Sequence, residues 1–166
     1  YKQTYIQYYT GFKSLKETLG FYDMFLIDPS GNIIFTEKKE SDLGQNLLSD
    51  HFKDTGLSQA FLRGRATTTF IDFSWYAPSE SPAAFMATPF VDKNNTLTGV
   101  IVFQLSSEKI NSIMKERVGM ARTNEAYLVG SDYLMRSDSI LEPVNRSVTA
   151  SFQFPEKGQL KTIAST

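Results

Sequence analysis

The sequence predicts an α+β fold: an antiparallel five-stranded sheet with flanking helices and a long N-terminal helix, followed by the start of a second, smaller module. Five segments rich in β-branched and aromatic residues are joined by turn-forming residues, as in hairpin-linked strands. Helix-like segments stand before the first strand, after the second and after the fifth. With 166 residues, 41% of them hydrophobic, the chain can bury a substantial core.

Residues 1–20 predict an amphipathic helix that enters the domain. Its large apolar side chains recur at three- and four-residue steps, the spacing of one helical face. These side chains are Tyr5, Tyr8, Tyr9, Phe12, Leu15 and Leu19. Gly20 predicts the end of this helix, because glycine readily adopts the left-handed conformation that follows many helices.

A hairpin and two short helices come next. The hairpin pairs "FYDMFLID" with "IIFT" across the turn "PSGN", in which Asp28 is expected to bind its own backbone. The stretches "LLSDHF" and "TGLSQAFLR" then predict two short helices separated by a turn.

Three further strands complete the sheet. They are predicted in "TTTFIDFSWY", "AAFMATPFV" and "GVIVFQLS", with polar connections between them. A helix should follow in "SSEKINSIMKER", with Ser107 as its N-cap and Ile110, Ile113 and Met114 at helical spacing.

The segment Glu125–Ser139, "EAYLVGSDYLMRSDS", repeats the order of the first hairpin: strand, polar turn, strand. One more strand is expected around "VTASFQF". We therefore predict an N-terminal helix over 1–20, a first module over 21–118 and the start of a second, reduced module over 119–166.

Composition and charge exclude several classes of function. A net charge of −1 and a pI of about 5.9 argue against nucleic acid as a partner. Cysteine is absent, which excludes disulfides and thiolate chemistry and fits a periplasmic or extracellular location. The longest apolar run, "VIVF", is far too short to cross a bilayer, so any membrane anchor of the parent protein is expected outside this segment.

Aromatic residues concentrate between Phe70 and Phe85, and aromatics with a polar tip suit the wall of a small-molecule pocket. The alternative is that they pack the core and the sheet. Asp72 either binds a cationic ligand or pairs with Arg63 or Arg65 at the surface, and the surface location is favoured. The candidate ligand-binding residues are Asp72, Phe73, Trp75, Tyr76, Phe85, Met86 and Gln104.

No pattern for catalysis or for metal binding stands out. His51, the single histidine, has only aspartates beside it and is expected on the surface. The sequence contains neither a phosphate-binding loop nor a nucleophile elbow. We expect no enzymatic activity, no metal and no cofactor in this chain.

The predicted order of elements, with "FLIDPSGNIIFT", "YAPSESPAAFMATPF" and "EAYLVGSDYLMRSDS", resembles the Cache sensor domains of bacterial membrane receptors, which are PAS-like and often double. The resemblance covers residues 21–139. It implies a periplasmic ligand-sensing domain between two transmembrane helices, in a chemoreceptor, a sensor histidine kinase or a cyclase. It also places the ligand pocket in the first module.

This sequence departs from the amino-acid-binding pattern of that family at two places. "LLSDHFKDTGLSQAF" occupies the region where the family has an arginine followed by an aromatic pair, and Gln104 stands in place of an aspartate. A neutral amide does not pair with an ammonium group as a carboxylate does, so the usual recognition of α-amino acids is not expected. Tyr133 stands where glycine is usual in the second hairpin.

These observations together predict an extracytoplasmic small-molecule sensor domain of a transmembrane receptor. Its partners would be a small ligand and, through the N-terminal helix, a second copy of the chain. One alternative is a structural or dimerisation module whose pocket is filled by its own aromatic residues. Another is a cytoplasmic PAS domain that holds haem or flavin.

Overall fold

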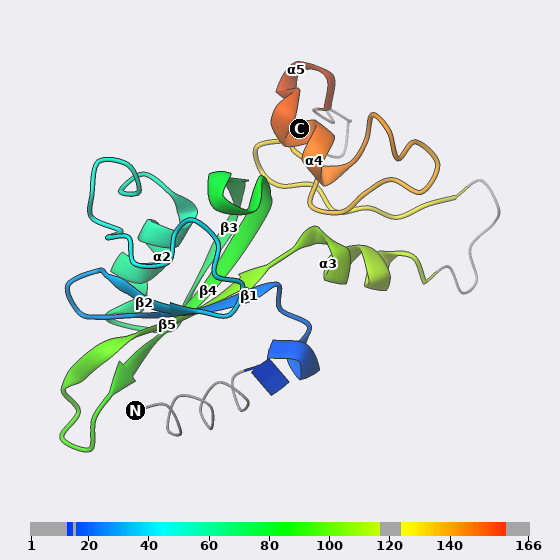
Figure 1. The fold of residues 1–166 in the computed structure, drawn as a ribbon. Helices are drawn as coiled ribbons and strands as arrows, with labels where there is room; N and C mark the ends of the chain where they lie inside the picture. Colours follow the sequence, from blue (N-terminus) through cyan, green and yellow to red (C-terminus); the bar gives the residue numbers. More distant parts are fainter. Residues whose placement is uncertain (1–12, 15, 117–123, 159–166) are drawn as a thin grey trace. The chain divides into compact units, whose positions relative to one another are not determined.

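The structure, a computed structural model, describes residues 13–14, 16–116 and 124–158 (Figure 1). The chain divides into two compact units, Tyr1–Leu105 and Ser106–Thr166. The module boundaries expected after residues 20 and 118 stay predictions. Within the described residues, no helix has both the length and the apolar character needed to cross a membrane.

The first unit is built on an antiparallel five-stranded sheet, as predicted (Figure 1). The strand order across the sheet is β2-β1-β5-β4-β3, so β2 and β3 form the two edges. The strands are β1 (Asp23–Ile27), β2 (Ile33–Thr36), β3 (Thr69–Tyr76), β4 (Ser81–Val91) and β5 (Leu97–Leu105). Every pair of neighbours is antiparallel, which confirms the α+β fold class.

The turn between β1 and β2 confirms the expected role of Asp28. Its Oδ1 accepts hydrogen bonds from the backbone N–H groups of Ser30, at 2.8 Å, and Asn32, at 2.9 Å. Gly31 has φ of +90°, a conformation that costs glycine little and other residues much more. The local chemistry of this turn therefore fixes the hairpin.

Helix α2 (Gly56–Gly64) packs against β3, β4 and β5. The side chain of Thr55 caps its first turn by accepting a hydrogen bond from the backbone N–H of Ser58. Gly64 lets the helix approach the sheet closely, because a Cβ there would lie 2.6 Å from the Cβ of Ala87. The main hydrophobic core lies between α2, the segment before it and the sheet, and includes Phe25, Ile27, Leu47, Phe61, Tyr76, Phe85 and Val102.

The helix expected at 47–52 does not form, and this part of the prediction is wrong. The segment is a series of turns, in which Asn46 accepts the backbone N–H of Leu48 with its own side chain at 2.8 Å. The N–H of Leu47 donates to the carbonyl of Gly31 at 2.8 Å. The first of these bonds is a local side-chain turn and the second ties the start of the segment to the β1–β2 turn, so the chain follows a series of turns here. The second expected helix is α2.

The end of the predicted N-terminal helix is confirmed. Residues 13–14 and 16–19 are helical, and Gly20 follows them with φ of +73°. The N–H of Phe21 reaches the carbonyl of Lys16 at 3.1 Å, the long hydrogen bond of a Schellman motif. The other predicted positions of the stripe (Tyr5, Tyr8, Tyr9, Phe12 and Leu15) lie outside the described residues.

The second unit begins with α3 (Ser107–Met114), the helix expected after the last strand. Its N-cap is Ser106, one residue earlier than predicted, with an extended backbone at φ −97° and ψ 161°.

The prediction of a strand around "VTASFQF" is wrong. This stretch forms α4 (Val148–Gln153), because the side chain of Ser147 caps it by accepting the backbone N–H of Ala150 at 3.1 Å, and the short α5 (Pro155–Gly158) follows.

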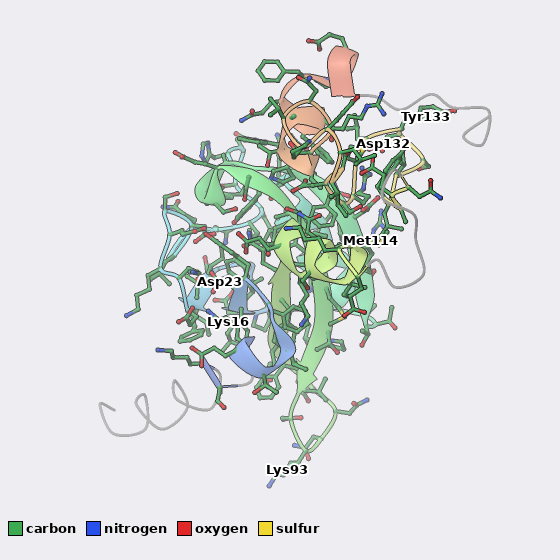
Figure 2. The ribbon with its side chains drawn as sticks, turned by 90° about the vertical axis from the view of Figure 1, so that its right-hand side faces the viewer. Lys16, Asp23, Lys93, Met114, Asp132 and Tyr133 are labelled. Atoms are coloured by element: carbon green, nitrogen blue, oxygen red, sulfur yellow. The ribbon has the colours of Figure 1, made fainter. Side chains whose placement is uncertain are left out.

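The repeated segment Glu125–Ser139 reverses direction as predicted, but only one isolated bridge, between Val129 and Met135, joins its two arms. The N–H of Leu128, which a regular ladder would pair with the carbonyl of Arg136, donates instead to the hydroxyl of Ser137, at 2.8 Å. Side-chain acceptors thus replace part of the expected ladder. Tyr133, labelled with its neighbour Asp132 in Figure 2, has φ of +64°, the left-handed conformation for which glycine is usual at such a turn.

Candidate functional site

Tyr76, the last residue of β3, lies at the centre of a buried polar cluster in the first unit. Its ring packs edge-to-face on Phe85 with 5.2 Å between the centroids. Its hydroxyl donates to Oδ2 of Asp42 at 2.6 Å, and both residues are fully buried. Burial, together with the negative charge of Asp42, raises the pKa of Tyr76 and keeps it a hydrogen-bond donor.

Gln104 of β5 joins this cluster through the sheet. It is directly opposite Phe85 on β4 and Asp23 on β1, and it is only 1% exposed. Its Nε2 donates to Oγ of Ser79 at 3.0 Å, and Ser79 ends the single turn η1 (Ala77–Ser79) that follows Tyr76. Three of the residues predicted from the sequence, Tyr76, Phe85 and Gln104, are therefore close together.

Asp23, at the start of β1 (Figure 2), ties the segment after β2 to the sheet. Its Oδ1 accepts backbone N–H groups from Met24 at 2.7 Å, Glu37 at 3.0 Å and Lys38 at 3.1 Å. Its Oδ2 accepts the hydroxyl of Thr36. Burial nevertheless raises the pKa of Asp23, because it outweighs these hydrogen bonds.

Glu40 and Asp42 bring two more carboxylates to the same region. The hydroxyl of Tyr22 donates to Oε1 of Glu40 at 2.6 Å. Burial raises the pKa of Glu40 against this hydrogen bond, and the charges of Asp42 and Asp23 raise it further. Burial also raises the pKa of Asp42, opposed by the hydrogen bond from Tyr76 and reinforced by the charge of Asp23. The three carboxylates repel one another.

Four buried side-chain atoms have no hydrogen-bond partner among the described residues: Glu40 Oε2, Asp42 Oδ1, Ser74 Oγ and Gln104 Oε1. An unsatisfied buried polar group is costly, so such atoms are uncommon in folded proteins. The amide oxygen of Gln104 cannot donate a hydrogen bond, and neither can the oxygens of Glu40 and Asp42 when these carboxylates are ionised. All three atoms are then acceptors. The cluster is complementary to a chemical group that donates hydrogen bonds.

The other candidates from β3 lie elsewhere. Asp72 is exposed, as the favoured interpretation had it, and Trp75 keeps 40% of its surface exposed. Phe73 is buried, but outside the main core. Phe73 and Asp72 line an open hollow of about 420 Å³ between β3 and α2, to which Gln59 and Arg63 also contribute.

Met86 and Phe85 are both among the predicted ligand contacts, and they lie on opposite faces of the sheet. Side chains of successive residues in a strand point to opposite faces of the sheet. Phe85 is fully buried on the face covered by α2, whereas the half-buried Met86 pairs with Phe103 and Phe70. His51 is exposed, as predicted.

Sequence analysis missed the acidic part of the cluster. Glu40 and Asp42 belong to "EKKESD", which has the composition of a solvated loop. The one usable signal was Asp23, a carboxylate within the apolar stretch "FYDMFLID" that predicts a strand. No pattern in the sequence near Tyr76 indicates its contact with Asp42, because the two residues are distant in the chain.

Solved structures similar to this chain are sensor domains. The sensor domain of the Vibrio cholerae histidine kinase DctB matches with a TM-score of 0.58 and 17% identity over 83% of this chain and 49% of its own. The ligand-binding domain of the Pseudomonas fluorescens chemoreceptor CtaA, in complex with L-serine, matches with a TM-score of 0.52 and 18% identity over 84% of this chain and 56% of its own.

A third similar structure is the ligand-binding domain of the Campylobacter jejuni chemoreceptor Tlp3 in complex with 4-methylisoleucine. Its TM-score is 0.54 at 9% identity, over 76% of this chain and 47% of its own. The chain spans about half the length of these three domains. No protein-family model and no curated protein sequence matches it. The resemblance to Cache-type sensor domains is thus confirmed at the level of the fold.

Proposed function

We propose that this chain is the ligand-sensing part of a bacterial transmembrane receptor and lies outside the cytoplasm. The observation that carries the proposal is the buried polar cluster of Tyr76, Asp42, Glu40 and Gln104, which leaves acceptor atoms unpaired within a sensor-type fold. A domain that served only as a scaffold would gain stability by pairing or replacing these atoms. Similarity to sensor domains of a kinase and of chemoreceptors supports the same function.

The ligand contacts are proposed in the first unit. Tyr76, Phe85 and Gln104 keep the role predicted for them, with Phe85 as an apolar wall and Gln104 and Tyr76 as polar contacts. Glu40 and Asp42 are added to this set because of their unpaired oxygens. Asp72, Phe73 and Trp75 on β3, and Met86 on β4, are assigned no direct contact.

Signalling requires only that the ligand prefer one of two arrangements of the elements around it. The segment after β2 is a suitable moving part, because hydrogen bonds to Asp23, Tyr22 and Tyr76 connect it to the sheet. A difference in affinity of about 1–3 kcal/mol between the two arrangements is enough for regulation. Flanking helices would carry the change to an output domain of the parent protein.

A thermal-shift screen of small polar metabolites tests this function. A ligand present at 100 times its dissociation constant stabilises the folded state by about 2.7 kcal/mol. Fluorescence of Trp75, the single tryptophan, reports unfolding of the first unit. The proposal predicts a saturable shift with at least one chemical class. A flat response to the whole screen would favour the alternative, a structural module without a ligand.

A further inference from the structure

Asp42 and Glu40 hold carboxylate oxygens away from water without a counter-ion. Asp42 is fully buried, and Glu40 is half-buried with its Oε2 hidden from solvent. Among the described residues, neither carboxylate has a lysine, arginine or histidine nitrogen at ion-pair distance. A buried charge without a partner is costly, and such a carboxylate lowers this cost by taking up a proton.

The groups that surround these two carboxylates are acidic or neutral. Asp23, at the start of β1, is fully buried, and its charge acts on both Glu40 and Asp42. Tyr22 and Tyr76 each donate a hydroxyl to one of the two carboxylates at 2.6 Å and supply no positive charge. One proton would therefore relieve the repulsion that several ionised carboxylates exert on one another.

Two lysines belong to or contact the acidic segment, which we define as residues 37–42. Lys38 belongs to it, and its Nζ lies 4.7 Å from the ring centroid of Tyr22. Burial raises the pKa of Glu40 more than the charge of Lys38 lowers it. Lys16 is paired with Glu37 at 2.6 Å. These lysines leave the balance of charge at the buried carboxylates negative.

Each carboxylate has one oxygen where a proton can be added without loss of an existing contact. Oδ2 of Asp42 accepts the hydroxyl of Tyr76, and Oε1 of Glu40 accepts the hydroxyl of Tyr22. The second oxygen of each carboxylate has no partner within the described part of the chain. A proton on that oxygen removes the charge and leaves both tyrosine hydrogen bonds in place.

The two tyrosine contacts attach the acidic segment to the sheet at two distant strands. Tyr22 directly precedes β1 and Tyr76 ends β3, and β5 and β4 lie between these strands. The backbone N–H of Leu43 donates to the carbonyl of Glu40 at 3.2 Å, and that of Gln45 donates to the carbonyl of Asp42 at 3.0 Å. These two amides therefore report whether the segment is docked.

We propose that the first unit responds to pH: in mild acid Asp42 and Glu40 bind a proton that keeps the acidic segment docked, and its release as the pH rises loosens the segment. This response goes beyond the proposed function, since it needs no small molecule. Burial raises the pKa of both carboxyl groups, so the docked segment binds a proton more tightly than the open one. Docking should weaken as the pH rises and level off above the raised pKa values.

Amide hydrogen exchange of the whole chain without ligand, corrected for the intrinsic effect of pH on exchange, tests the proposal. Protection of the Leu43 and Gln45 amides should be at least about fivefold higher at about pH 5 than at about pH 8. The control is the first turn, where Ser30 and Asn32 donate to Asp28. Against the effect of burial, hydrogen bonds lower the pKa of Asp28, so protection there should change by less than about twofold.

Variants that imitate the protonated carboxyl groups locate the response. In the double variant Asp42→Asn and Glu40→Gln, protection at about pH 8 should equal that of the original chain in acid and should not depend on pH. Asp50→Asn is the matched control, because its side chain is 98% exposed, and it should keep the full response. In the original chain, the carboxyl carbon signals of Asp42 and Glu40 should titrate at a higher pH than that of Asp28, which a purely structural role would not require.

The outcomes separate this inference from the proposed function. Equal protection of the two reporter amides in acid and in base, or a pH response that persists in the double variant, would overturn it. If Ca²⁺ at about pH 8 restored the protection that acid gives, the cluster would be a metal site, and the proton assignment would be wrong. The ligand screen is run at one fixed pH, so a failed screen would leave the proton response standing, and a missing proton response would leave the sensor function standing.

Discussion

Carboxylates in the two units of the chain are in opposite situations. In the second unit, Glu125 accepts hydrogen bonds from the hydroxyl of Ser139 and the backbone N–H groups of Ile140, at 2.7 Å, and Leu141, at 3.1 Å. Burial alone would raise the pKa of Glu125, but these hydrogen bonds and the charge of Arg146 lower it. In the first unit, the pKa of Asp42 is raised and one of its oxygens is unpaired.

Asp138 in the second unit extends the same contrast. Its Oδ2 accepts the side-chain amide of Asn111 at 2.7 Å, and its Oδ1 accepts the N–H of Val148 at 2.8 Å, at the start of α4. Carboxylates that are satisfied in this way hold a fold together. Carboxylates with unpaired oxygens weaken the fold they belong to, which is a reason to look for a ligand beside them.

The largest effect is expected from Asp138→Ala. The substitution removes an acceptor from Val148 and leaves the buried amide of Asn111 unpaired, at a cost of about 2–3 kcal/mol. Amide hydrogen exchange over Val148–Gln153 should become faster. Glu142→Ala, which breaks an exposed pair with Arg146, is the control and should change stability by less than about 0.5 kcal/mol. Equal effects of the two variants would contradict the structural role of Asp138.

A smaller loss is expected from Tyr76→Phe. Without the hydroxyl, Asp42 keeps its charge but loses the side-chain donor to its Oδ2, which costs about 1–2 kcal/mol at neutral pH. Urea unfolding followed by Trp75 fluorescence measures the loss. In Asp42→Asn the same tyrosine substitution should cost less, by about 0.5–1 kcal/mol, because the hydrogen bond is no longer charge-assisted. An identical cost in both backgrounds would mean that Asp42 is not charged at that pH.

Asp42→Asn should leave stability unchanged or raise it by up to about 1 kcal/mol. Its amide can still accept from Tyr76, while the repulsion by Glu40 and Asp23 disappears. Denaturant unfolding without any ligand is the measurement. If the variant lost more than about 1 kcal/mol of stability, Asp42 would be a structural carboxylate, as Asp138 is.

The smallest expected effect is a difference between Asp42 and Glu125 in how their ionisation changes the stability of the fold with pH. For Asp42 the folded pKa is above the unfolded one, so its ionisation destabilises the fold. The penalty is complete above the folded pKa, shrinks as the pH falls below that value and is gone below the unfolded pKa. For Glu125 the folded pKa is below the unfolded one, so its stabilisation is complete above the unfolded pKa and is lost as the pH falls through the folded pKa.

The free energy of unfolding of two amide variants, measured as a function of pH, tests this difference. At neutral pH, Asp42→Asn should be more stable than the original chain and Glu125→Gln should be less stable. Both differences should shrink toward zero in acid, from opposite sides. Tyr76, Glu40 and Asp23 are the titratable groups that act on Asp42, so Glu40→Gln should reduce the size of the Asp42→Asn effect. If both variants changed the stability in the same direction, the contrast between the carboxylates of the two units would be wrong.

Local chemistry made part of the molecule predictable. Asp28 and Gly31 supply the acceptor and the positive φ that the first turn requires, so the hairpin could be read directly. The second reversal is less regular than predicted, because the N–H of Leu128 donates to the hydroxyl of Ser137 and not to a carbonyl of the other arm. The segment 47–52 has helix-forming composition, but its backbone pairs with a turn that lies earlier in the sequence.

The sequence by itself determined the α+β class and the five strands, because periodicity and turn chemistry act over a few neighbouring residues. The ligand-binding role of Tyr76, Phe85 and Gln104 stays a prediction. Only the tertiary structure decided that Phe85 is on the buried face covered by α2 and that Asp42 meets Tyr76. Burial and charge repulsion depend on residues that are distant in the chain. The polar stretch that contains Glu40 and Asp42 is therefore recognisable as part of a buried acidic cluster only in the folded structure.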